Sequence, residues 1–543
     1  MTATTARAVF SGSRRRFLTG LACAGTLSIT GCGLRDWAHN GFKVGPEYAR
    51  PDAPVAEQWI DQADPRIATT PAQLADWWTT LRDPVLDQLI QESHLQNLTL
   101  REAGARVLEA RYLRTFTAGT LFPQAQAISG AYTRNKQSPA RANLPPTIQQ
   151  WYDDWNVGIG TSWEIDFWGR YRRAVEDADA QLDATIENYD DVLVVLLADV
   201  ASTYIEMRTY QQRLRYALDN VAAQEKLLAT TEFQLREGAT NERDVQQART
   251  VLEQTSALVP QMEAGVRRAS NRLCMLLGMP PRDLAAELGP APIPKVPPQI
   301  ALGIPADLVR RRPDIRRAER ELAAQSARIG VAVSDLYPHM GLNGSIGVAA
   351  EEFGGLFGGS TSLVGVAGPF VRWDILHYGR LASRIGIQDA RFEQLAWSYQ
   401  QQVVNAGREA EDAVITFLKS QERVRHIEAS TQAATKTLEL ATKQYLEGLV
   451  DYTTVYLFSA DLATRQDELA VSYGTVAQSL VAVYRALGGG WEIRLNPTAT
   501  NVSPLPPVTP EPANESPEPA ASEPAPSAPT PSAPTPPDAA PGT

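Results

Sequence analysis

The sequence predicts a mixed, mainly α-helical fold that is built from a tandem duplication and in which each chain adds four long strands to a shared barrel. Three observations predict it. Short motifs recur at a common offset of 210 residues, two proline-free intervals of 69 residues separate paired glycines, and several segments alternate between apolar and polar side chains.

The N-terminus resembles an export signal followed by a lipidation site. Three arginines at 14–16 precede a run of apolar and small residues, which is the pattern of a signal peptide. Small residues come directly before Cys32, as in the lipobox of a bacterial lipoprotein. We expect a lipoprotein-type signal peptide at 1–31 and a lipidated N-terminal segment at 32–83. A plain signal peptide and a twin-arginine signal remain alternatives.

Duplication explains how the rest of the chain is organised. The paired motifs are Trp163 with Gly169-Arg170 and Trp373 with Gly379-Arg380, Glu237-Gly238 and Glu447-Gly448, and Leu277-Gly278 and Leu487-Gly488. We therefore expect a first structural repeat at 84–279, a Pro-rich linker at 280–305 and a second repeat at 306–495. The remaining residues, 496–543, are rich in proline and poor in aromatic residues, so we expect a disordered tail.

The glycine spacing predicts two long helical hairpins. The intervals 169–238 and 379–448 are rich in good helix formers. At 1.5 Å per residue each would span roughly 100 Å. Gly238 and Gly448 then end these helices, because glycine readily adopts the left-handed conformation of a helix C-cap. The 40 residues that follow each glycine return as the second arm. Shorter helices at 86–115 and 313–334 begin the two repeats.

Strand-like segments separate the short helices from the long ones. Residues 155–167 and 339–348 alternate between apolar and polar or small side chains, and 124–134 and 363–375 do so more weakly. A tilted strand of this length can cross a bilayer, although a soluble sheet with one wet face would show the same alternation. The polar positions expected to face a lumen are Asn156, Ser162, Glu164, Asn343 and Ser345. Four strands cannot close a wide barrel, whereas three copies would supply twelve.

Composition argues against several other functions. The 543 residues carry a formal net charge of −11, so no basic face is expected to bind nucleic acid. Five scattered histidines and three cysteines without a CxxC motif predict neither a metal site nor a cofactor. No catalytic motif is present, so an enzyme is not expected. Cys274 lies in an apolar run and is expected to be a core residue.

Several motifs together resemble the TolC-like outer-membrane efflux channels, specifically the OprM/NodT-type lipoproteins. The motifs are Val44-Gly45-Pro46-Glu47-Tyr48, Trp77-Trp78 with Asp83-Pro84, Arg311-Arg312-Pro313-Asp314-Ile315, Gly330-Val331-Ala332, Tyr337-Pro338 and the two Gln-x-x-Glu-Gly elements that begin at Gln234 and Gln444. The likeness covers residues 43–495.

The resemblance implies a homotrimer with a twelve-stranded barrel in outer-membrane lipid and a long α-helical barrel in the periplasm. It further implies a passive conduit for drugs, toxic compounds or metals, served by a periplasmic adaptor and an inner-membrane RND or ABC transporter. A type I protein-secretion channel of the same architecture is an alternative, and a structural coiled-coil periplasmic lipoprotein is a weaker one.

By the same resemblance the hairpin tips should contact the adaptor, and the residues after the tips should form a closed aperture. The expected adaptor contacts are Arg236, Glu237, Gly238, Tyr445, Glu447, Gly448 and Leu449. The candidate aperture residues are Asp244, Asp451, Tyr452, Tyr456 and Leu457. Here the sequence departs from many relatives, because Leu457 stands where they often place an acidic residue, and Thr454 stands where the first repeat has Asp244. A constriction formed by tyrosine and leucine side chains is the resulting hypothesis.

Overall fold

The computed structural model describes residues 37–495, except for 69, 71–72, 143–144 and 146. The expected signal peptide, Cys32 and the Pro-rich tail lie outside the described residues. Among the helices that are described, none combines the length and the apolarity of a membrane-spanning helix.

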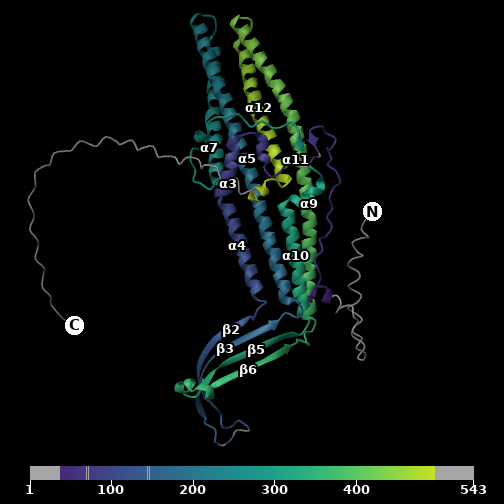
Figure 1. Ribbon diagram of the computed structural model, residues 1–543. Helices are drawn as coiled ribbons and strands as arrows, with labels where there is room; N and C mark the ends of the chain where they lie inside the picture. Colours follow the sequence, from purple (N-terminus) through teal and green to yellow (C-terminus); the bar gives the residue numbers. More distant parts are fainter. Residues whose placement is uncertain (1–36, 69, 71–72, 143–144, 146, 496–543) are drawn as a thin grey trace, which may run out of the picture. The chain divides into compact units, whose positions relative to one another are not determined.

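The two repeats have corresponding elements (Figure 1). The first contains α3 (Pro84–Gln96), α4 (Leu98–Gly119), β2 (Ala125–Lys136), β3 (Trp151–Ile165), α5 (Arg170–Arg236), α6 (Glu242–Ser256) and α7 (Leu258–Leu276). The second contains α10 (Pro313–Ser334), β5 (His339–Ala350), β6 (Leu363–Arg372), α11 (Arg380–Leu446) and α12 (Tyr452–Ala486). Both long helices, α5 and α11, have 67 residues, as the equal glycine spacing predicted.

Shorter elements precede, connect and follow the helices and strands of the two repeats. They are β1 (Ile67–Ala68), η1 (Trp77–Leu81), α8 (Leu284–Leu288), β4 (Ile300–Ala301), η2 (Pro305–Asp307), α9 (Leu308–Arg311) and, at the end, η5 (Trp491–Leu495). Strand β1 pairs in parallel with β4, so the linker lies beside the N-terminal segment. Two short 3₁₀ helices, η3 (Phe353–Phe357) and η4 (Gly359–Thr361), join β5 to β6.

Two expected helices are interrupted. The segment expected at 86–115 is divided between α3 and α4 at Asn97, whose side chain caps α4 by accepting from the Leu100 amide at 2.8 Å. The return arm of the first hairpin is divided between α6 and α7 near Ala257, whereas α12 is continuous. Pro260 explains the difference, because it has no amide hydrogen to bond to the carbonyl four residues earlier.

The Leu-Gly motifs mark places where one helix stacks end to end on another. Asn97 Nδ2 donates to the Leu276 carbonyl at 2.8 Å and thereby joins the start of α4 to the end of α7. In the second repeat Arg312 Nη1 donates to the Ala486 carbonyl, also at 2.8 Å, and joins α10 to α12. Gly278 has φ +72°, and a Cβ there would lie 2.4 Å from the Gln96 carbonyl oxygen. Glycine is therefore required by both conformation and space.

The N-terminal segment is held against the start of α5. Arg173, which is buried, donates from Nε to the Val44 carbonyl at 3.1 Å and from Nη2 to the Gly45 carbonyl at 3.3 Å. Gly45 has φ +90°, and a Cβ there would lie 2.4 Å from Gly330 Cα on α10. The Val-Gly-Pro and Gly-Val-Ala motifs thus contact each other through two glycines.

A hydrophobic core fixes α10 against α11. Ile315 and Leu322 of α10 pack on Tyr399 and Val403 of α11, and all four side chains are buried. In Figure 1 the arms of each hairpin lie side by side, α5 with α7 and α11 with α12. The hairpin tips are the C-terminal ends of α5 and α11, and the strands lead into the N-terminal ends of the same two helices.

Candidate channel wall and hairpin tips

Four antiparallel strands form one sheet in the order β2-β3-β5-β6. Residues directly opposite each other in an antiparallel pair have side chains on the same face, so the register assigns every side chain to a face. One face is mainly apolar and carries Ile128, Tyr132, Trp155, Val157, Ile159, Trp163, Ile165, Met340, Leu342, Ile346, Val348, Leu363 and Val371. The sheet is therefore strongly two-faced.

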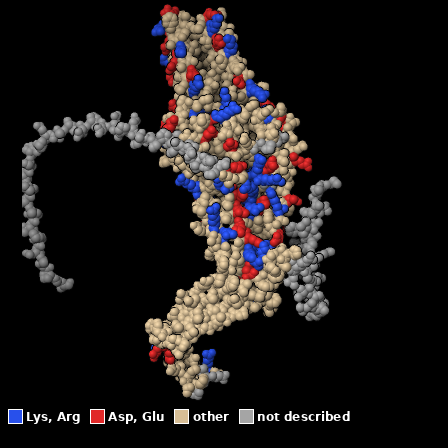
Figure 2. All heavy atoms as spheres, viewed as in Figure 1, with Lys and Arg blue, Asp and Glu red and all other residues tan. Residues whose placement is uncertain are grey.

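Apart from Phe353 of η3, which packs on Trp155, the described residues leave the apolar face uncovered. Ile128 is 77% exposed, Val371 is 68% exposed, and Ile346 and Ile159 are exposed by more than half. In the view of Figure 2 the sheet surface is almost free of Lys, Arg, Asp and Glu, and the charges gather on the helices and at the far end of the strands. An uncharged apolar surface of this extent is typical of a surface that contacts lipid or protein.

The opposite face carries the residues that the sequence suggested for a lumen. Ser162 lies opposite Asn343, Gly160 opposite Ser345, and Asn156 opposite Ala349. Glu164 belongs to the same face. The register therefore brings all five expected side chains together on one side of the sheet. Strand β6 departs from the pattern, because Val364, Val366 and Phe370 lie on this polar face.

Glu164 lies where the sheet meets the helices. Its Oε1 is 2.7 Å from His339 Nδ1 and 3.6 Å from Arg170 Nη1. Arg170 Nη2 in turn lies 3.8 Å from Asp335 Oδ1, and Arg384 pairs with the same carboxyl group at 2.9 Å. This network joins both repeats at the base of the strands and leaves the acidic side chain of Glu164 paired on the polar face.

Both hairpin tips have the same backbone geometry. At the first, the Ala239 amide donates to the Gln234 carbonyl at 2.8 Å, and Gly238 has φ +73°. At the second, the Leu449 amide donates to the Gln444 carbonyl at 2.8 Å, and Gly448 has φ +74°. This is the Schellman arrangement, in which glycine supplies the left-handed residue. A Cβ on either glycine would meet no atom within 4 Å, so the requirement is one of conformation alone.

Most of the expected adaptor contacts are exposed at these tips. The exposed positions are Arg236, Glu237, Gly238, Glu447, Gly448 and Leu449. Tyr445 is different, because its side chain is buried rather than displayed. Its hydroxyl donates to Gln234 Oε1 of the first hairpin at 2.6 Å, and its ring lies 5.8 Å from that of Tyr452. Within the chain, Tyr445 therefore holds the two tips together.

Tyr452 also differs from the expected aperture residue. It is fully buried among Ala248, Tyr445 and Val455, so within the chain it belongs to a small hydrophobic core behind the tips. Burial, together with Tyr445 and Asp244, raises the pKa of Tyr452 to about 12. Its hydroxyl has no hydrogen-bond partner among the described residues. Asp244 is buried as well and accepts from Thr240 Oγ1 at 2.8 Å.

The other aperture candidates remain accessible. Asp451 is the N-cap of α12, where its Oδ1 accepts from the Thr454 amide at 3.3 Å, just as Asn241 caps α6 in the first repeat. Tyr456 is half-buried and Leu457 is exposed. Asp451 and Leu457 are thus the fully exposed members of the expected set, and Tyr456 is partly exposed.

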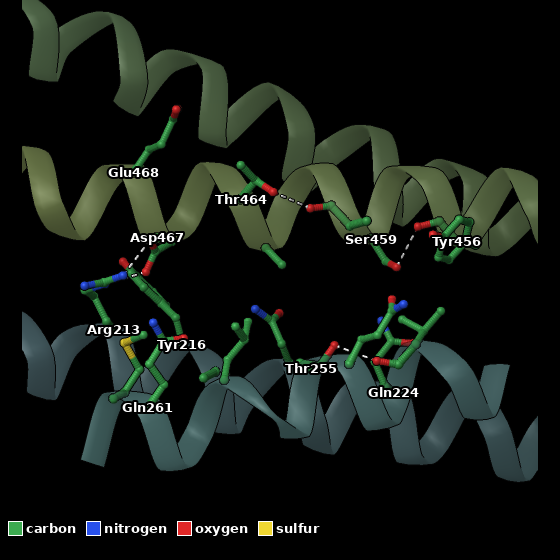
Figure 3. Close-up of a pocket in the computed structure, with 18 residues that line it drawn as sticks. Arg213, Tyr216, Gln224, Thr255, Gln261, Tyr456, Ser459, Thr464, Asp467 and Glu468 are labelled. Atoms are coloured by element: carbon green, nitrogen blue, oxygen red, sulfur yellow. Dashed lines mark hydrogen bonds and ion pairs between the residues drawn. The ribbon is translucent and has the colours of Figure 1, made fainter. Parts of the chain in front are cut away.

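Beyond the tips, polar contacts bridge the two hairpins around a cavity of about 340 Å³ (Figure 3). Arg213 of α5 forms two bonds with Asp467 of α12, at 2.6 and 3.0 Å. Asn220 Nδ2 donates to Gln466 Oε1 at 2.9 Å. Tyr456 and Ser459 of α12 face Thr255 and Gln224 across the cavity. These bridges were not predicted, because no sequence pattern relates residues that lie about 250 positions apart.

Metal ligands do not converge in the part of the chain that is described: no three His, Cys, Asp or Glu side chains come together as an ion would need.

Comparisons with known proteins identify the family. The family model described as "Outer membrane efflux protein" matches twice, over residues 89–279 and 304–489. A nodulation protein T of Rhizobium leguminosarum bv. viciae is 30% identical over 456 residues, which are 82% of this chain and 90% of that protein. The toluene efflux pump outer membrane protein TtgF of Pseudomonas putida is 31% identical, over 84% of this chain and 95% of its own length.

Solved structures give the same result. The outer-membrane channel OprN is 32% identical with a TM-score of 0.77, over 83% of this chain and 99% of OprN. CusC is 26% identical with a TM-score of 0.70, over 82% of this chain and all of CusC. The predicted fold class, mixed and mainly α-helical with four strands per chain, and the predicted resemblance are thereby confirmed. The chain belongs to the family of outer membrane efflux proteins, the efflux channels of the outer membrane.

Proposed function

We propose that three copies of the chain pool their strands into a closed twelve-stranded barrel and serve as a passive conduit for small molecules. The observation that carries the proposal is that β2 and β6, the two edges of a two-faced sheet, both lack a partner strand within the described chain. In lipid, unpaired backbone groups cost several kcal/mol each, so such edges must pair. Pairing β2 of one copy with β6 of the next closes a ring at three copies.

Exposed apolar stripes on the helices support the same arrangement. Helix α4 exposes Leu108, Tyr112 and Phe116, which are spaced four residues apart and so share a face. On the other side of the chain, α11 exposes Trp397 and Val404, seven residues apart. A head-to-tail contact between two different surfaces of the same chain generates a ring when the rotation between copies closes.

The two predicted repeats, 84–279 and 306–495, would then each add one hairpin to a six-hairpin helical barrel. We assign the exposed tip residues to contact with a periplasmic adaptor and assign the source of cargo to an inner-membrane RND or ABC transporter. Relatives are named for cation, toluene and solvent efflux, so the cargo class is small molecules. We assign the polar sheet face to the lumen.

The N-terminal segment supports lipid anchoring at Cys32. Trp37, five residues later, packs its ring 5.1 Å from Phe167 and 5.6 Å from Trp168, between the strands and α5. Aromatic residues at such a position are typical of a membrane interface. Five residues reach at most about 18 Å, so an acyl chain on Cys32 would enter the membrane close to the sheet.

The mass of the purified protein in detergent tests the proposal. The full chain and a Cys32→Ser variant should both be trimeric and detergent-dependent, and both should migrate differently before and after heating. The Cys32→Ser variant should lack the acyl mass. A Cys32→Ser protein that is monomeric and soluble without detergent would show that the strands do not enter a membrane.

A further inference from the structure

We propose that Arg134 and Lys136, at the outer end of β2, form a binding site for the phosphate group of an anionic lipid in the outer leaflet. The proposal rests on the strands crossing the outer membrane as proposed above. It adds a specific lipid partner and the residues that bind it.

Strand register places both cations on the lipid-facing side. Arg134 lies opposite Asp153 and Lys136 opposite Trp151, while Tyr132 lies opposite Trp155 on the same face. This is the face of Ile128, Val157 and Ile159. The residues that alternate with them on β2, Thr133 and Asn135, lie on the opposite face, which would line the lumen of a barrel. Arg134 and Lys136 therefore lie on the face toward lipid.

The distance along β3 places them at the level of the head groups. Ile165 and Trp155 bound the apolar stretch and are ten residues apart, which is about 33 Å along the strand. With a tilt of 35–45° this covers roughly 25 Å of the membrane normal, the height of the apolar band of such barrels. Trp151 lies four residues further, so the group around it extends roughly 10 Å beyond the hydrocarbon.

Both cations are pre-positioned on one indole ring. The Arg134 guanidinium carbon lies 5.6 Å from the centre of the Trp151 ring, and Lys136 Nζ lies 5.1 Å from it. Such cation–π contacts orient the charges without neutralising them. Trp151 itself is 52% exposed. The two cations and the indole form a concentrated, accessible positive site.

Local carboxylates do not cancel this charge. Arg134 Nε lies 3.8 Å from Asp153 Oδ1, which is a weak pair, and the Arg134 side chain is 61% exposed. Lys136 pairs with no carboxylate among the described residues. On the lipid-facing side of these two strands, two cations and one carboxylate leave one net positive charge, whereas Asp154 lies on the opposite face. Arginine and lysine are the side chains that bind phosphate, arginine with a planar fork and lysine as a point charge.

Lipid retention by the intact trimer tests the site. Native mass spectrometry would count copies of a diphosphorylated glucosamine-disaccharide lipid bound by the wild type, by Arg134→Gln/Lys136→Gln and by a control, Arg423→Gln/Lys436→Gln. The control removes two exposed cations from α11. Retention by the site variant should fall about thirtyfold, since each basic residue near an anionic lipid surface contributes roughly fivefold. The control should retain lipid like the wild type.

Two further measurements show whether the site binds lipid phosphate or free phosphate. They also distinguish failure of the lipid site from failure of the proposed barrel. The dephosphorylated lipid should bind the wild type and the site variant equally weakly, and excess inorganic phosphate should not displace the diphosphorylated lipid. Equal retention by the wild type and the site variant, retention independent of phosphate, or displacement by inorganic phosphate would each overturn the lipid site. A site variant that stays trimeric leaves the barrel proposal intact, whereas a monomeric wild type would remove both.

Discussion

The Tyr445 hydroxyl donates a hydrogen bond to Gln234 Oε1 at 2.6 Å, so the tip of the second hairpin is tied to the tip of the first. Tyr452 lies beside it, with the ring centres 5.8 Å apart, but its own buried hydroxyl has no hydrogen-bond partner among the described residues. Two neighbouring tyrosines therefore contribute differently to the tip: one joins the hairpins, and the other fills the space between them.

This difference gives opposite expectations for the same substitution. Tyr445→Phe removes a hydrogen bond and leaves Gln234 without it, which should cost about 1 kcal/mol. Tyr452→Phe removes an unsatisfied buried hydroxyl and should leave stability unchanged or raise it. Hydrogen exchange at residues 231–240 and 441–450 would measure the effect locally. Faster exchange in Tyr452→Phe than in Tyr445→Phe would contradict the assignment.

A second tie between the hairpins, Arg213 with Asp467, should contribute measurable coupling. The pair is bidentate and the Arg213 side chain is only 20% exposed, so a double-mutant cycle should give about 0.5–1 kcal/mol. The exchange Arg213→Asp/Asp467→Arg should recover part of the stability lost in the single variants. The matched control is Arg215 with Asp219 on α5, which are 4.0 Å apart and largely exposed, and whose coupling should be near zero. Equal coupling for both pairs would mean that the bridge between hairpins contributes nothing specific.

Local sequence patterns predicted much of the fold but less of the arrangement at the hairpin tips. Equal spacing between glycines predicted two helices of equal length because helix termination is a local property of one residue. Period-2 alternation predicted which side chains of β3 and β5 share a sheet face, and the register agrees there, whereas β6 places three apolar side chains on the polar face. The burial of Tyr445 and Tyr452 depends instead on which hairpin packs beside which, and no local pattern encodes that. The break near Ala257 could have been read from Pro260, whereas the break at Asn97 depends on the end of a helix 179 residues away.

The contact between Gly45 and Gly330 should tolerate no side chain. Gly45→Ala would place a Cβ 2.4 Å from Gly330 Cα and would force φ +90° on alanine. Both effects destabilise the native contact, so we expect a loss of about 2–4 kcal/mol and detachment of the N-terminal segment. Limited proteolysis of residues 37–55 in the detergent-solubilised protein would report the detachment.

Gly386→Ala is the matched control for that prediction. Gly386 lies within α11, where a Cβ would meet no atom within 4 Å. Alanine is favoured over glycine in a helix by about 1 kcal/mol, so this variant should be neutral or slightly more stable. If both glycine variants were cut equally slowly at the N-terminal segment, the close approach of the two glycines would not matter for its attachment.

Breaking the ion pair between Asp190 and Arg494 should make the free energy of unfolding depend more strongly on pH. Asp190 is fully buried on α5, and Arg494 of η5 donates to its two oxygens at 2.7 and 2.8 Å. Burial raises the pKa of Asp190, and the bond to Arg494 opposes this rise. Arg494→Gln removes the opposing charge and leaves a buried carboxylate without its cation, which should cost roughly 3 kcal/mol at neutral pH.

The sign of the pH effect follows from the direction of the shift. When the folded-state pKa of an acid lies above its unfolded value, the folded state holds the proton more tightly, so stability is lost as pH rises through the folded pKa. In Arg494→Gln the pKa of Asp190 rises further, and the deficit against the wild type should therefore shrink as the pH is lowered from 7.5 toward 4.5. Thermal unfolding at a series of pH values would measure it. Adding Asp190→Asn to Arg494→Gln removes the titrating group, so the double variant should lose the extra pH dependence of the single variant. A deficit that stays constant with pH in the single variant would show that Asp190 is not its source.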